Sequence, residues 1–147
     1  MMKFLGAAFL ALSVGACQSG QGFQSEQTRT YGNNFPVAKD GMAAVYIVRD
    51  VAPVDAPAIG ITRSRSPVGS LPGSSWMRLD LPPDPYDLRA YGTQESTELI
   101  ITVVAGETRF LLAQPKGTND AELLWLSWED GRRLVRQGQQ VGTYTYY

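Results

Sequence analysis

The segment Trp76–Tyr91, WMRLDLPPDPYDLRAY, decides the fold class of this chain. In residues 76–81 apolar side chains alternate with others, which is typical of a β-strand with one face on a core. The prolines in Pro82–Pro85 remove backbone donors, so neither a helix nor a sheet ladder continues through them. Alternation resumes in Tyr86–Tyr91. We therefore expect two consecutive strands joined by a proline turn, and an all-β fold.

Short strand-forming runs separated by turn residues continue along the chain from residue 40. In the run at 76–81, Trp76 and Arg78 are expected to face one way, and Met77 and Leu79 the other. The expected strands are Met42–Arg49, Ala58–Arg63, Pro67–Leu71, Trp76–Leu81, Tyr86–Tyr91, Glu98–Val104, Thr108–Gln114 and Ala121–Trp128. Such a series predicts one small antiparallel β-sandwich rather than a parallel sheet.

Three of these segments carry more specific expectations. Glu98–Val104 (ELIITVV) is apolar at both alternating positions, which indicates a central strand covered on both faces. Ala121–Trp128 (AELLWLSW) is compatible with a strand or a helix, and we favour a strand because Leu124 and Trp128 would then share one face. Asp130–Gln140 is rich in charged residues and has weak helical character, so we expect at most a short helix near the C-terminus.

The first residues have the three parts of a secretory signal. Within Met1–Ala16, Lys3 gives the positive start, Phe4–Leu12 is an apolar run, and Ser13–Ala16 contains small residues ahead of a cleavage point. A membrane-spanning helix needs ~20 apolar residues, about twice the length of this run. We therefore expect a signal peptide over residues 1–16 and no transmembrane helix.

Cys17 follows this segment and is the single cysteine of the chain. The sequence Val14-Gly15-Ala16-Cys17 resembles the lipobox at which bacterial lipoproteins are acylated and cleaved. The alternative is an ordinary secretory signal with an incidental cysteine. Gln18, rather than Asp, comes next, and by resemblance to Gram-negative lipoproteins this favours the outer membrane, with the domain facing the periplasm. A palmitate-type lipid anchor at Cys17 is the resulting expectation.

Residues 18–39 are rich in Gln, Gly, Ser, Thr and Asn, so they bury little apolar surface and are expected to form a flexible tether. Phe23, Tyr31 and Phe35 are candidates to dock part of it onto the folded domain. The expected organisation is a signal peptide over 1–16, an acylated N-terminus and tether over 17–39, and one β-sandwich domain over 40–147.

The composition excludes several chemistries. The chain has no histidine, so neither a Ser-His-Asp triad nor a histidine-dependent zinc site can be built. Acylation of Cys17 would remove the only thiol, and one cysteine cannot form an intramolecular disulfide. The net charge of −1 is too balanced to suggest a nucleic-acid partner or an anionic membrane surface. We predict no cofactor and no metal.

Three aspartates near the proline turn, Asp80, Asp84 and Asp87, are the candidates for carboxylate chemistry such as glycoside hydrolysis. They are also candidate calcium ligands, although no ligand-spacing motif is present. Aspartates beside prolines are normally turn formers. We therefore assign no catalytic residue.

Other residue types indicate a binding surface. Arg63 and Arg65 can bind an anion such as a phosphate or a carboxylate, or can protect a solvated strand edge by their charge. Trp128, beside two acidic residues, is the best candidate for an exposed aromatic, whereas Trp76 and Trp125 are expected in the core. Tyr144 and Tyr146 alternate in the β-prone tail, which can pair with its own sheet or with another chain.

The order of the motifs resembles a bacterial lipoprotein family of unknown function whose fold is similar to PEGA-like and transthyretin-like β-sandwiches. The resemblance covers about residues 40–135. It rests on Asp40-Gly41 before Ala44–Arg49, Val68–Leu71, Trp76 with Leu79–Pro82, Tyr86–Leu88, and Ala105–Phe110. It implies a fold and carries no catalytic residues.

These expectations combine into a functional hypothesis. The chain is predicted to be a membrane-anchored envelope lipoprotein that acts as a non-enzymatic binding or accessory module for a protein or glycan partner. The alternative is a carboxylate-dependent enzyme that acts on cell-wall glycans. An enzyme needs converging ionisable groups in a pocket, whereas a binding module needs an accessible surface.

Overall fold

Strand β1 (Ala43–Arg49) runs through the centre of the molecule, and all of its residues are buried. The computed structural model describes residue 35, residues 38–94 and residues 98–144. Within these residues β1 belongs to a five-stranded sheet, sheet A. Its order is β8 (Asp120–Trp125), β7 (Thr108–Lys116), β1, β4 (Ser75–Leu81) and β9 (Gln139–Gln140).

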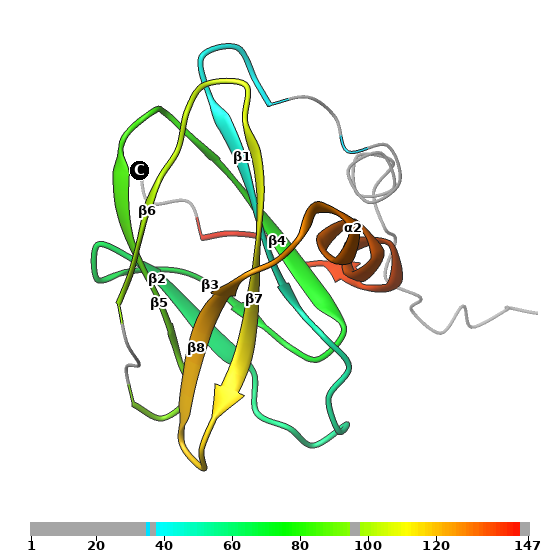
Figure 1. The fold of residues 1–147 in the computed structure, drawn as a ribbon. Coiled ribbons are helices and arrows are strands. Elements are labelled where there is room, and N and C mark those ends of the chain that lie inside the picture. The colour runs from blue at the N-terminus through cyan, green and yellow to red at the C-terminus, as the bar shows by residue number, and fades with distance from the viewer. Residues whose placement is uncertain (1–34, 36–37, 95–97, 145–147) are drawn as a thin grey trace, which may run out of the picture.

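A second sheet, sheet B, packs against one face of sheet A (Figure 1). Its order in the described residues is β3 (Ser66–Leu71), β2 (Ile59–Arg63), β5 (Pro85–Tyr91) and β6 (Leu99–Thr102). The chain alternates between the sheets, because β4 belongs to sheet A and β5 to sheet B. The proline turn therefore carries the chain from one layer of the sandwich to the other.

The register of β1 decides which side chains face which layer. Tyr46 lies opposite Arg78 in the antiparallel pairing with β4, and opposite Phe110 in the parallel pairing with β7. Because side chains alternate along a strand, these three share the outer face of sheet A. The intervening residues, such as Ile47 and Met77, point toward sheet B and form the core between the sheets. The two faces predicted for residues 76–81 are confirmed.

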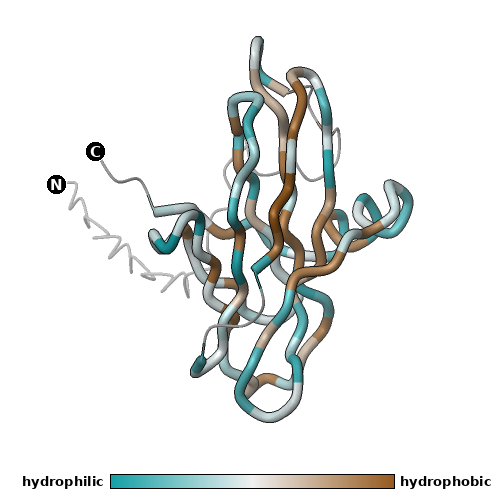
Figure 2. The backbone as a smooth tube through the Cα atoms, turned by 60° about the vertical axis from the view of Figure 1, so that its left-hand side comes forward, coloured by the Kyte–Doolittle hydropathy of each residue, from teal (hydrophilic) through white to brown (hydrophobic). Residues whose placement is uncertain are grey.

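The hydropathy of the chain follows this layering. Figure 2 shows the most hydrophobic stretches running through the middle of the molecule, with hydrophilic residues gathered at turns. A buried charged side chain joins the two layers: Arg49, at the end of β1, donates from Nη1 to the carbonyls of Pro57 and Leu71, both at 2.8 Å. Burial lowers the pKa of this guanidinium. Arg49 thereby ties sheet A to the start and end of the β2–β3 hairpin.

Helix α2 (Trp128–Gln137) covers the outer face of sheet A and creates a second core. Leu134 and Val135 pack there on an aromatic cluster in which the rings of Tyr46 and Phe110 stack at 5.2 Å. Ser127 caps the helix, since its Oγ accepts from the Asp130 N–H at 3.1 Å. Among the described residues, no helix is long and apolar enough to cross a membrane.

Phe35 joins this second core from the N-terminal side. Its ring centroid lies 5.7 Å from that of Tyr46 and 5.9 Å from that of Phe110, and the guanidinium of Arg132 lies 5.0 Å from it. The docking predicted for Phe35 is confirmed. Phe23 and Tyr31 lie outside the described residues.

The predicted fold class, a small all-β sandwich with a short C-terminal helix, is confirmed. Most strand pairs are antiparallel, but β1 with β7 and β4 with β9 are parallel. Both parallel pairs join segments that are far apart in the sequence. Periodicity within a strand carries no information on such long-range neighbours.

The expectation of a central strand at Glu98–Val104 is wrong. Only Leu99–Thr102 forms a strand, β6, and it lies at the edge of sheet B. Ile100 is 63% exposed and Val104 is equally so, while Ile101 and Val103 face the core. β6 therefore buries one face, as its neighbour β5 does, and its outward apolar residues remain in solvent.

The segment Ala121–Trp128 divides between two elements. Strand β8 confirms the strand assignment up to Trp125, but Ser127 then caps α2 and Trp128 becomes its first residue. Leu124 and Trp128 therefore do not share a strand face. The helix begins two residues before the predicted Asp130 because the Ser127 cap, followed by acidic residues in the first turn, fixes its start.

Candidate functional site

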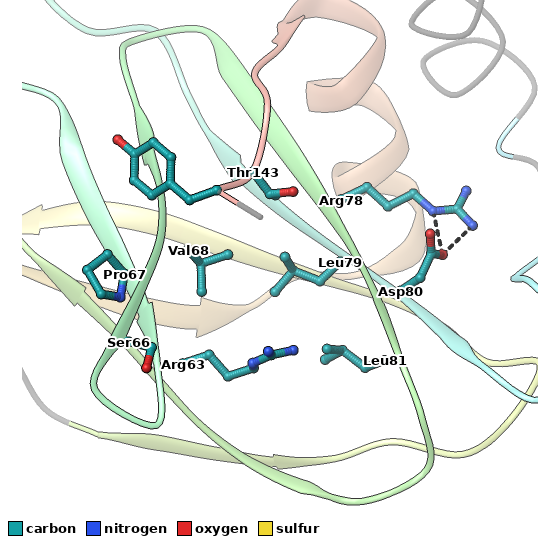
Figure 3. Close-up of a pocket in the computed structure, with 10 residues that line it drawn as sticks. Arg63, Ser66, Pro67, Val68, Arg78, Leu79, Asp80, Leu81 and Thr143 are labelled. Atoms are coloured by element: carbon teal, nitrogen blue, oxygen red, sulfur yellow. Dashed lines mark hydrogen bonds and ion pairs between the residues drawn. The ribbon is translucent and has the colours of Figure 1, made fainter. Parts of the chain in front are cut away.

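A groove of about 310 Å³ opens where the edges of the two sheets face each other (Figure 3). One wall is the end of β4 (residues 78–81), and the other is the start of β3 (residues 66–68). Arg63 at the end of β2 lines it as well, and Thr143 with Tyr144 closes one side. We call this the edge groove.

The C-terminal segment forms one end of the edge groove by pairing with both sheets in turn. The Gln139 N–H donates to the Ser74 carbonyl at 2.9 Å, and the Val141 N–H to that of Trp76 at 2.8 Å. Three residues later, the Tyr144 N–H donates to the Val68 carbonyl of β3 at 2.6 Å. The segment thus adds to the edge of β4 only as far as Trp76 and then crosses to sheet B.

Beyond this crossing, the edge of β4 lines the groove. Both backbone groups of a strand residue point to the same neighbour, and this direction alternates along the strand. Because Ser74 and Trp76 accept from the C-terminal segment, the N–H and C=O of Asp80 point to the same edge. Among the described residues no strand lies against Asp80 on that side. The groove therefore offers a short stretch of open strand edge.

The side chains at this edge form a compensated ion pair. Arg78 donates to one carboxylate oxygen of Asp80 from Nε at 3.0 Å and from Nη2 at 2.8 Å, and its Nη1 lies 3.1 Å from the Tyr46 hydroxyl. Lys39 approaches the other oxygen at 3.3 Å. Burial lowers the pKa of Arg78, but the hydrogen bond and charge of Asp80, with Tyr46, outweigh it and raise this pKa overall. Both oxygens of the Asp80 carboxylate thus have a positively charged partner.

Arg63 differs from Arg78 in having no carboxylate. It is exposed, and Figure 3 shows it between Ser66 and Leu81, from the opposite sheet. It forms no ion pair or hydrogen bond with another described residue. Its charge opposes the rise that burial and Asp84 cause in the pKa of Tyr86. The groove therefore holds one uncompensated positive charge.

The structure brings together two of the predicted binding residues, Arg63 and Tyr144, and separates the others. Arg65 lies outside the groove, in the tight turn between β2 and β3. Trp128 lies on the outer layer with α2, where its ring meets that of Phe110 edge-on at 5.3 Å. Tyr146 and Cys17 fall outside the described residues.

The tryptophans divide differently from the expectation. Trp76 is buried as predicted, and Trp128 is 48% exposed. Trp125, which was expected in the core, is 46% exposed, so that prediction is wrong. It ends the edge strand β8 with Arg109 stacked over its ring at 5.4 Å, and an edge position leaves one flank of a large side chain in solvent.

The candidate carboxylates are held on separate elements. Asp80 belongs to β4 of sheet A, Asp84 to the exposed turn, and Asp87 to β5 of sheet B, where Arg89 binds it at 3.0 Å. No group of three or more carboxylates or other metal-binding side chains is close enough to hold a metal ion in the described part of the chain. Two of the three aspartates therefore serve as arginine partners.

The chain matches no family model, no curated protein and no solved structure at a significant level. The resemblance to an envelope lipoprotein family therefore remains a prediction.

Sequence reasoning missed the open edge of β4 and the contribution of Ser66 and Thr143. One signal was available at the opposite wall. Pro67 within a strand indicates an edge position, because proline cannot donate to a ladder. No comparable signal marks Leu79–Leu81, since its edge position depends on where the C-terminal segment stops pairing.

Proposed function

We propose that this protein is an outer-membrane lipoprotein, anchored through acylated Cys17 and facing the periplasm, whose β-domain binds a protein or glycan partner and catalyses no reaction. The edge groove carries this proposal. It combines an open strand edge, apolar side chains on both walls and an arginine that has no ion-pair partner among the described residues, which are the components of a recognition site.

The electrostatics of the aspartates support binding over catalysis. Paired carboxylates that catalyse glycoside hydrolysis converge on one bond and have pKa values pushed apart by their surroundings. Here Asp80 and Asp87 each bind an arginine two positions away on the same strand, which neutralises their charge locally. This arrangement favours a structural role for both carboxylates.

The anchor is tested by metabolic labelling with a clickable palmitate analogue. Wild-type protein should carry the label and fractionate with outer membranes, whereas Cys17→Ala should carry none, because no other cysteine can be acylated. Wild-type protein that carries no label would refute the anchor.

The groove is tested by photo-crosslinking in intact cells, with p-benzoylphenylalanine at Ser66 inside the groove. The matched control carries the same group at Ile100, an exposed residue on the outer side of β6. We expect a discrete adduct from position 66 that is absent from position 100 and is lost in the Cys17→Ala background. Identical patterns from the two positions would contradict a specific site. Mass spectrometry of the adduct distinguishes protein from glycan.

A further inference from the structure

We propose that the open edge of β4 at Leu79–Leu81 receives an extended segment of a partner protein as an added strand, and that Arg63 binds an acidic side chain of that segment. This inference rests on the proposed function, which leaves the partner as a protein or a glycan. It narrows the partner to an extended peptide segment with an apolar residue and an acidic residue two positions apart.

The edge of β4 already pairs with an added strand. Residues 139–141 lie along Ser74–Trp76 through backbone hydrogen bonds of 2.9 and 2.8 Å. The same alternation of backbone groups continues to Asp80, whose N–H and C=O point to the groove. A second extended segment placed after residue 141 would therefore continue the same ladder. Strand addition of this kind takes its affinity from backbone hydrogen bonds.

A segment added at this edge would present its side chains alternately to two sides. Along an added strand, alternate side chains would face the space between the sheets, where Leu79 and Leu81 of β4 meet Val68 of β3. The remaining side chains would face the outer side, beside Lys39 and Asp80. An apolar side chain is therefore required at one inward position of the segment.

Arg63 gives the groove a positive charge that an acidic side chain of the segment would complement. Arg63 belongs to the inward-facing series of β2, since Ile59 and Ile61 of that series face the core. Figure 3 places it beside Leu81 at the mouth of the groove. Asp80 is already bound by Arg78 and Lys39, so it does not compensate Arg63. An Asp or Glu two positions from the apolar residue of the segment would lie on the same inward face and meet this guanidinium.

The groove is less suited to a glycan. Sugar rings are commonly bound on aromatic faces, and among the residues that line the groove Tyr144 is the only aromatic one. Its other lining residues are aliphatic or charged, apart from the hydroxyl-bearing Ser66 and Thr143. The observations therefore favour an extended peptide with an apolar residue and an acidic residue two positions apart.

The probe is a library of random ten-residue peptides displayed on phage and selected on the full-length chain in detergent micelles. We expect enrichment of the apolar-and-acidic pattern. The affinity of a selected peptide should fall about tenfold or more in Arg63→Gln, the range for losing a charged hydrogen bond. Arg65→Gln is the matched control: it removes the same charge two residues away, outside the groove, and should leave the affinity unchanged.

Two further readouts identify a strand. Methylation of alternate backbone nitrogens of the selected peptide should abolish binding in one register and spare it in the other. Bound peptide should also slow hydrogen exchange at the Asp80 amide. No enriched peptide, equal loss in both arginine variants, or indifference to methylation would overturn the inference.

Two other occupants are distinguishable outcomes. If deletion of residues 145–147 is needed before any peptide binds, the chain's own end occupies the edge and the partner segment is refuted. If a soluble cell-wall glycan binds instead and Ser66→Trp blocks it, strand addition is refuted while the proposed binding function stands. Absence of any groove-specific adduct in cells would refute the proposed function itself.

Discussion

At the scale of single residues, the guanidinium of Arg78 determines which substitutions the end of β4 can accept without loss of stability. Its side chain is only 4% exposed, and Asp80 binds it through two hydrogen bonds. A charge removed from water in this way is expensive unless a partner of opposite charge remains in place. The Arg78–Asp80 pair therefore fixes the strand that forms one wall of the groove.

Asp80→Ala should lower the free energy of unfolding by about 2–3 kcal/mol, because it deprives a buried guanidinium of its carboxylate. Lys39→Ala removes the outer ion pair to the same carboxylate. Because the Lys39 side chain is 66% exposed, this substitution should lower the free energy of unfolding by less than about 1 kcal/mol. Urea unfolding monitored by circular dichroism measures both. Equal losses in the two variants would contradict the importance assigned to the buried pair.

The turn beside Arg63 stores backbone strain. Ser64 and Arg65 connect β2 to β3 with φ values of 49° and 66°, a region that side chains other than Asn and Gly disfavour. Two-residue hairpin turns with positive φ at both positions prefer Asn-Gly. The unfavourable sequence holds Arg63 and Ser66 opposite each other at the groove.

The double substitution Ser64→Asn with Arg65→Gly should stabilise the protein by about 1 kcal/mol, since both new residues adopt this turn more readily. Thermal unfolding should show a rise in Tm of about 4–8 °C for that gain in a domain of this size. Arg65→Ala is the control, because alanine meets the same steric cost at positive φ as arginine. A rise of equal size in the control would show that charge removal, not turn geometry, is responsible.

At the scale of elements, the packing of α2 on sheet A depends on Gly131, although alanine has the higher helix propensity. A Cβ at Gly131 would lie 2.2 Å from Cγ and 2.5 Å from Cβ of Phe110. The missing side chain lets the helix lie directly on the aromatic cluster of sheet A. Close approach to the sheet therefore outweighs the cost of a glycine within a helix, about 1 kcal/mol.

Gly131→Ala should destabilise the protein by about 1–3 kcal/mol, the range for overpacking a filled core, despite the better helix propensity of alanine. Gln137→Ala, at an exposed position of the same helix, should change stability by less than about 0.5 kcal/mol. Chemical denaturation gives both values. Repeating Gly131→Ala in a Phe110→Leu background should recover part of the loss, and a full loss there would place the clash elsewhere.

The elements show where sequence reasoning succeeds and where it stops. All eight predicted strands exist, because alternation and turn residues are local properties that the backbone expresses directly. Position in a sheet is not local. Glu98–Val104 looked central from its apolar residues, yet its strand lies at an edge because, within the described ranges, β5 alone pairs with it. Trp125 was misplaced for the same reason.

The same limit applies to the site. Arg63 and Tyr144 were each named from the sequence as candidates, because the arginines at 63 and 65 can bind an anion and a β-prone aromatic tail can pair with another chain. Their meeting in one groove depends on the hydrogen bond from Tyr144 to Val68, which joins residues far apart in the chain. The edge at Leu79–Leu81 depends on where residues 139–141 leave β4. Neither contact has a local signature.

At the scale of the whole molecule, sheet A has a core on each face. Sheet B covers one face, whereas α2 and Phe35 cover the other. The N-terminal side of the described chain thus meets the domain at the helix layer, while the edge groove opens between the sheets. Under the proposed anchoring through Cys17, the tether would hold the domain at the helix layer through Phe35 and would reach the outer side of the groove only through the ion pair of Lys39 with Asp80. A partner could then bind without displacing the contacts of Phe35.

Ion pairs and hydrogen bonds of surface carboxylates set an acid limit, the pH below which the folded molecule loses stability. The pKa of Asp130 is lowered by hydrogen bonds from Arg133 and Ser127 at the start of α2. Hydrogen bonds with Gln114 and Lys116 lower the pKa of Glu122 on the β7–β8 hairpin. A carboxyl whose folded pKa lies below its unfolded value stabilises the native state when it is ionised. This contribution is fully present above the unfolded values, near 3.8 and 4.5, and is lost as the pH falls through the lower folded values.

The urea midpoint should therefore decrease as the pH is lowered from neutral toward 3. The decrease should be modest because Asp130 is exposed and Glu122 is only partly buried, so salt screens both carboxyl groups. The double variant Asp130→Asn with Glu122→Gln keeps both side chains polar but cannot titrate, so its midpoint should vary less with pH over this range. At neutral pH the variant should be slightly less stable than the wild type, and at acid pH the two should converge. Parallel profiles would mean that other carboxyl groups set the acid limit, and the surface network of α2 and the β7–β8 hairpin would then have no part in it.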